Sequence, residues 1–137
     1  MTEHSLQTPL VPASWGEVID KITILEIKNQ RIVSAAALVN IRNELGALNA
    51  VVTAQLAMTA GISALRDKLY EVNAHLWDIE DAIREHEQRQ DFSDSFIALA
   101  RAVYQQNDER AALKRRINID SGSGLVEEKS YHGQAPD

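Results

Sequence analysis

The most informative residues of this sequence are polar side chains placed inside apolar helix faces. In the stretch KITILEIK, Glu26 lies at a helical angle between Ile19 and Ile22, since each residue turns a helix by about 100°. Asn29 falls within the same apolar arc. Burying a carboxylate without a cation or hydrogen-bond donors is costly. We therefore expect Glu26 to meet polar partners from other parts of the chain.

Candidate partners lie on two later segments, where polar residues stand beside or within an apolar seam. With Glu26 and Asn29 they predict a polar layer between helices. Its further members are Asn73, Trp77, Glu80, Arg84, Asn107 and Arg110. Such a layer either fixes the register of the helices, the best-attested use of buried polar groups in coiled coils, or lines a pocket for a small ligand. We favour the register-fixing network and keep the pocket as the alternative.

Other kinds of site find little support in the residue types. The chain has no cysteine, which removes disulfides, thiolate nucleophiles and zinc fingers together. Its four histidines have no metal-binding spacing. No glycine-rich loop precedes a helix, as a phosphate site requires. We therefore predict no catalytic residue, no metal and no cofactor.

The charge pattern limits the classes of partner that the protein can bind. The net charge is −6, and acidic residues outnumber basic ones in residues 60–90, so a nucleic-acid backbone would be repelled. The basic run Lys114, Arg115 and Arg116 falls at a predicted helix C-terminus, where cations complement the macrodipole. No long apolar run or signal-peptide pattern occurs. We expect a cytoplasmic protein that binds neither nucleic acid nor membranes.

Helices must position these residues, because apolar residues recur at steps of three and four and no segment alternates as a strand does. The predicted class is all-α: a long coiled-coil-like hairpin plus a third helix, in up-down-up order. The predicted organisation is a flexible arm at 1–13, a helical domain at 14–120 with helices at about 15–58, 62–90 and 94–119, and a Ser/Gly linker with a C-terminal tail packed on the domain at 121–137.

Local signals mark the ends of these helices. Ser14 and Glu17 form the S-x-x-E pattern of a capping box at the first helix start. Gly46 is a point where the first helix could kink, and Gly61 separates it from the second. The sequence SGSG at 121–124 stops the third helix, because Ser and Gly favour flexible backbone.

The lengths of the first two helices do not match. At 1.5 Å per residue the first would span about 66 Å and the second about 43 Å. The apolar residues of 15–28 would then overhang in water. Either this segment bends back, the tails cover it, or a second copy does, and we favour a homodimer. The predicted interface residues are Trp15, Val18, Ile22, Leu25, Leu125 and Tyr131.

Four motifs carry a family resemblance: SWGEVIDKITILEIK, LWDIEDAIREHE, FIALARAVYQQNDERAALKRRIN and LVEEKSY. Together they resemble a small bacterial all-helical family of domains of unknown function, marked by KITILEIK and LVEEKSY. The resemblance spans roughly residues 14–131 and implies no activity. It does imply that LVEEKSY belongs to the folded unit, which makes Glu127, Glu128 and Lys129 candidate site or interface residues.

The chain is also similar, over shorter stretches, to the all-helical chorismate mutases. That similarity involves Ile19, Asp20, Arg31, Glu80, Arg84 and Gln105. Such an enzyme holds a dicarboxylate among several cations in a dimer, and this sequence has Ala13 where the leading arginine of the first helix belongs.

From these observations we expect a non-enzymatic helical interaction or assembly module, homodimeric, that docks a protein partner through its seam and tail. The alternative is a small-molecule-binding protein, or a chorismate-mutase-like helical enzyme, that uses the polar layer between the helices.

Overall fold

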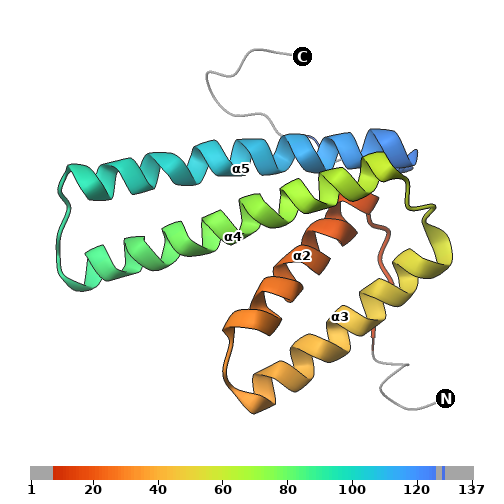
Figure 1. Ribbon diagram of the computed structural model, residues 1–137, viewed down its shortest axis with the longest axis horizontal. Helices are drawn as coiled ribbons and strands as arrows, with labels where there is room; N and C mark the ends of the chain where they lie inside the picture. Colours follow the sequence, from red (N-terminus) through yellow and green to blue (C-terminus); the bar gives the residue numbers. More distant parts are fainter. Residues whose placement is uncertain (1–7, 126–127, 129–137) are drawn as a thin grey trace.

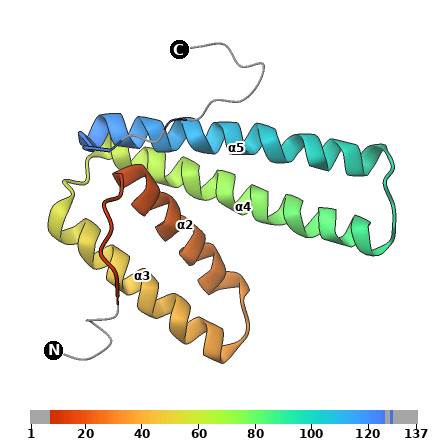
Figure 2. The same cartoon turned by 180° about the vertical axis from the view of Figure 1, so that it is seen from behind.

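The chain folds into four helices, with no strand, over the residues that this computed structural model describes, 8–125 and 128. The helices are α2 (Trp15–Arg31), α3 (Ala35–Gln55), α4 (Ala60–Gln88) and α5 (Asp94–Ser121). α4 and α5 lie side by side as a long antiparallel hairpin, and α2 crosses one end of it at an angle (Figure 1). α3 runs along the outer side of α2, which is also clear from behind (Figure 2). The predicted all-α class is confirmed.

The predicted single helix over 15–58 is wrong, because the chain leaves the helix at residues 32–34. Ile32 is extended, with φ −83° and ψ 135°. Ser34 then caps α3 by accepting the backbone N–H of Ala37 at 3.3 Å. Two β-branched residues followed by a capping serine weaken a helix locally, and apolar periodicity on both sides concealed that signal. The predicted three-helix, up-down-up arrangement is replaced by four helices, and Gly46 lies within an unbroken α3.

The second and third predicted helices agree with α4 and α5 to within two residues at each end. α4 begins at Ala60, where Thr59 accepts the backbone N–H of Ile62 at 3.1 Å, so Gly61 lies inside its first turn. α5 ends at Ser121, and Gly122 follows in the left-handed conformation with φ 67°. A residue without Cβ takes that conformation at little cost. The tail at 126–127 and 129–137 lies outside the described residues.

The break after α2 lets the apolar overhang fold back into the chain's own core. Ile19 packs with Ile62, Leu69 and Ile117, where α2, α4 and α5 meet. Burying each such side chain contributes about 1.5–3 kcal/mol. Of the three ways to cover residues 15–28, the chain takes the first, in which this segment bends relative to the helix that follows.

A glycine allows α2 to approach α5 closely. A Cβ on Gly16 would lie only 2.4 Å from the backbone oxygen of Lys114. The backbone N–H of Gly16 donates to Asn118 Oδ1 at 2.7 Å. Ser14 accepts from Glu17 N at 3.2 Å, as the capping box predicts, but the Glu17 carboxylate accepts from Lys114 Nζ at 2.7 Å. Polar contacts thus hold the start of α2 against α5.

Candidate functional site

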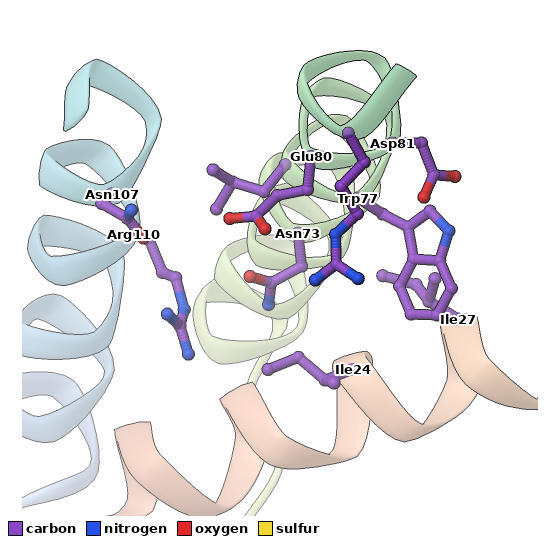
Figure 3. Close-up of a pocket in the computed structure, with 10 residues that line it drawn as sticks. Ile24, Ile27, Asn73, Trp77, Glu80, Asp81, Asn107 and Arg110 are labelled. Atoms are coloured by element: carbon purple, nitrogen blue, oxygen red, sulfur yellow. The ribbon is translucent and has the colours of Figure 1, made fainter. Parts of the chain in front are cut away.

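A cavity of about 350 Å³ opens where α2 diverges from the α4–α5 hairpin. We call it the cleft. Side chains from all three helices point into it (Figure 3). α2 supplies an apolar wall, α4 supplies most of the polar groups, and α5 closes the remaining side. Its lining residues are Ile24, Ile27, Asn73, Leu76, Trp77, Glu80, Asp81, Arg84, Asn107 and Arg110.

The structure brings together six of the eight residues of the predicted polar layer. The six that line the cleft are Asn73, Trp77, Glu80, Arg84, Asn107 and Arg110. The two others lie elsewhere on α2. Glu26 pairs with Arg66 at 3.0 Å, with its side chain 33% exposed, and Asn29 accepts from Arg42 Nε at 3.0 Å. The break at 32–34 explains Asn29, because it folds α3 back so that Arg42 reaches that side chain.

The buried base of the cleft is centred on Asp20, a residue that the predicted layer omits. Asp20 is 1% exposed and accepts three hydrogen bonds. Arg110 donates two of them, from Nε at 2.9 Å and from Nη2 at 2.5 Å, and Asn73 Nδ2 donates the third at 2.9 Å. This arrangement is a bidentate guanidinium–carboxylate pair, the strongest common form of charge-assisted hydrogen bonding.

A sequence signal for Asp20 existed. Gly16, Asp20, Thr23 and Ile27 follow one another at steps of four, three and four, and all four are buried. A small or polar residue at three of four positions on one helix face indicates a close, polar contact with another helix. The more apolar arc around Glu26 concealed this face, so Asp20 is named in the sequence only by the chorismate mutase resemblance.

The amide of Asn73 is oriented by its neighbours. Thr23 Oγ1 donates to the backbone oxygen of Asp20 at 2.7 Å, so that hydroxyl accepts from Asn73 Nδ2 at 2.9 Å. The second Nδ2 hydrogen goes to the Asp20 carboxylate, which can only accept. The Asn73 carbonyl oxygen therefore points away from both partners, and it accepts no hydrogen bond within residues 8–125 and 128. Since no fully buried side-chain polar atom there lacks a partner, this oxygen opens to the cleft.

The rim of the cleft carries charges that are not paired within the described chain. Glu80, Asp81 and Arg84 are exposed and form no ion pair or hydrogen bond there. Trp77 is half-buried beside them, with the Arg31 guanidinium 5.9 Å from its ring centroid. The indole ring of Trp77 and the unpaired charges around an open cavity can bind a ligand by ring contact and ion pairing.

The predicted interface residues are not gathered on one exposed surface. Ile22 and Leu25 are 0% and 3% exposed inside the chain's own core. Trp15 and Val18 are half-buried, and Leu125 is 48% exposed at the end of the described chain. Tyr131 lies outside the described residues, as do Glu127 and Lys129, whereas Glu128 pairs with Arg115. The overhang that motivated these assignments therefore does not occur.

The described chain can also be compared with the requirements of a metal site and of a membrane span. No three or more histidine or carboxylate side chains in residues 8–125 and 128 are placed to hold a metal ion. Over the same part of the chain, no helix combines the length and the apolar character needed to cross a membrane.

Comparison with known proteins identifies a family and no relative of known activity. No curated protein matches this chain, and no solved structure matches it. A family model described as "Family of unknown function (DUF6165)" matches residues 10–136, nearly the whole sequence and all four helices. The chain therefore belongs to this family of unknown function.

Proposed function

We propose that the protein is a non-enzymatic binding module whose cleft between α2 and the α4–α5 hairpin takes a small polar ligand. The observation that carries this proposal is the contrast between the base of the cleft and its rim. A layer that serves only to fix helix register needs its members paired with one another. Asp20, Asn73 and Arg110 at the base are paired in this way.

The rim departs from that pattern. Glu80 and Arg84 are four residues apart on α4, the spacing at which opposite charges pair readily along a helix, yet no ion pair joins them. Both side chains line a cavity whose volume lies within the range of small-ligand sites, about 300–1,000 Å³. The two interpretations of the polar layer thus apply to different parts of it: the base stabilises the fold, and the rim is available to a ligand.

The geometry favours this function over the two others raised by the sequence. A chorismate-mutase-like enzyme needs several cations around a dicarboxylate, whereas Arg110 is neutralised by Asp20 and the rim offers two carboxylates for one guanidinium. The homodimeric interaction module stays a prediction, although Ile22, one of its predicted interface residues, lies in the chain's own core.

Native mass spectrometry of the protein purified gently from its own host tests the proposal. We expect a population with a few hundred extra daltons per chain, and loss of that population in Trp77→Ala. Arg84→Gln should change the affinity in a direction set by the charge of the ligand. Glu26→Gln is the matched control, since Glu26 lies on α2 outside the cleft. A ligand retained equally by Trp77→Ala and the control would contradict the proposal.

A further inference from the structure

We infer that the cleft recognises an amine-bearing ligand, an organic cation whose ammonium group enters between Asn73 and Glu80. This inference rests on the proposed function, since it assigns a chemical class to the ligand of the same cleft. It follows from three features of the described side chains: a fixed acceptor that opens to the cleft and has no donor there, an excess of unpaired negative charge, and an aromatic wall.

The fixed acceptor is the carbonyl oxygen of Asn73. This residue is 6% exposed, and its amide nitrogen is held by Asp20 and Thr23 at 2.9 Å each. Because both of its hydrogens are used, the amide cannot flip without losing two buried hydrogen bonds. The carbonyl oxygen thus presents a fixed acceptor to the cleft. An acceptor that a ligand covers must receive a hydrogen bond or lose free energy, so the ligand group that fits here is a hydrogen-bond donor.

The unpaired charges of the lining predict that this donor group carries a positive charge. Arg31 is paired with Asp78 at 2.6 Å, and Arg110 with Asp20. The charged side chains of the lining that have no partner in the described chain are Glu80, Asp81 and Arg84. Two carboxylates against one guanidinium leave a net negative cleft, which favours a cation over an anion.

The spacing of residues on α4 brings the Asn73 acceptor, the Trp77 ring and two of the three unpaired charges onto one side of the helix. Asn73, Trp77, Glu80 and Arg84 follow at steps of four, three and four. Such steps place side chains on one face. Figure 3 shows the Asn73 amide and the Glu80 carboxylate on the same side of α4, facing the space between α4 and α5. An ammonium group carries three donors and no acceptor, so it can donate to both residues, while Trp77 offers a ring to the attached carbon chain or to the cation itself.

Three five-carbon probes that differ in charge but hardly in size test the inference: cadaverine, pentane-1,5-diol and glutarate. Isothermal titration calorimetry at low ionic strength should show cadaverine binding at least about tenfold more tightly than the diol, and glutarate not binding, since an ammonium–carboxylate hydrogen bond is worth about one such factor. Glu80→Gln should weaken cadaverine binding by about tenfold. Arg84→Gln should leave it unchanged or tighter, because it removes the repelling cation.

The control for nonspecific attraction to an acidic protein is Glu71→Gln. Glu71 is an exposed acid on the same helix that does not line the cleft. Equal weakening by Glu71→Gln and Glu80→Gln would overturn the inference, and so would failure of cadaverine to bind at millimolar concentration. Preference for glutarate, with weakening by Arg84→Gln, would overturn the amine assignment while leaving the cleft as a binding site. In that case the co-purified ligand sought by native mass spectrometry would be an anion.

Discussion

The hydrogen bonds of Asp20 predict that Asp20→Ala is one of the most destabilising substitutions on a polar residue of this chain. The substitution removes the acceptor of two hydrogen bonds from Arg110, at 2.9 and 2.5 Å, and of one from Asn73 at 2.9 Å. These contacts join α2 to both α4 and α5. Their loss leaves the Arg110 guanidinium without this carboxylate and one amide hydrogen of Asn73 without its acceptor.

The magnitude follows from burial. Breaking a buried ion pair by removing one partner costs about 3–5 kcal/mol. The Arg110 side chain is 28% exposed, so water recovers part of that loss, and we expect a decrease of about 3 kcal/mol in the free energy of unfolding. This is a large share of the total stability of a typical domain, about 5–15 kcal/mol. Urea unfolding followed by far-ultraviolet circular dichroism measures this decrease. The m value, the slope of the free energy of unfolding against urea concentration, should stay unchanged.

The control for Asp20→Ala is Glu26→Ala on the same helix. Glu26 pairs with Arg66 at 3.0 Å, but these side chains are 33% and 27% exposed and belong to no larger network of described contacts. Its loss should cost less than about 1 kcal/mol. A double-mutant cycle with Arg110→Ala should show coupling of at least about 1 kcal/mol. Equal effects of Asp20→Ala and Glu26→Ala, or additive effects in the cycle, would refute the reasoning.

Three further predictions test the fold. Gly16→Ala should lower the melting temperature, since its Cβ would lie 2.4 Å from a backbone oxygen of α5, whereas Gly46→Ala, with nothing within 4 Å, should raise stability by up to about 1 kcal/mol; stabilisation by both would contradict the close approach of α2 to α5. Ile22→Glu buries an unpaired charge at a site that is 0% exposed, so circular dichroism should show an unfolded chain, and a folded monomer would contradict this assignment of Ile22. The Ser93 hydroxyl and backbone N–H, donating to the carboxylate, hold the pKa of Asp91 below its usual range. The folded state thus favours the anion, and this contribution to stability is present above the unfolded pKa of about 3.9 and lost as the pH falls through the folded pKa. An NMR titration should show the pKa rising in Ser93→Ala, and an unperturbed pKa in the parent chain would contradict the contact.

Periodicity predicted the parts of the fold in which local and tertiary preferences agree. The seam of α4 repeats at three and four residues from Ile62 onward, and buried Leu69, Val72 and Ile79 follow it. In a pattern of that length, single residues that break the periodicity do not obscure it, so it predicts α4 and α5 to within two residues at each end. The break at 32–34 could not be seen in the same way. Periodicity measures which face is apolar, and that face continues through the break.

The candidate site was predictable to the extent that it lies on α4 and α5. Asn73 belongs to a polar stripe beside the apolar seam of α4, and Arg110 stands where the apolar edge of α5 should continue. Glu26 meets a polar partner from another helix, as expected, but this partner is Arg66 and the pair lies outside the cleft, because the apolar arc of α2 is not buried as a whole. The structure tilts α2 so that Gly16, Asp20 and Thr23 face the hairpin, and this rotation depends on the close approach at Gly16, which the apolar arc around Glu26 does not reveal.

The polar residues of α4 change character along the helix, and that change separates stability from binding. Asn73 is buried and oriented by two hydrogen bonds, Trp77 is half-buried, and Glu80 and Arg84 are exposed and unpaired in the described chain. The cause is geometric: α2 contacts Asn73 through Asp20 and Thr23, then diverges from the α4–α5 hairpin (Figure 1), and Arg31 at its C-terminal end pairs with Asp78. Substitutions near the crossing should therefore act on unfolding, whereas those at Glu80 and Arg84 should act on ligand affinity with little effect on stability, since exposed charges contribute little to it.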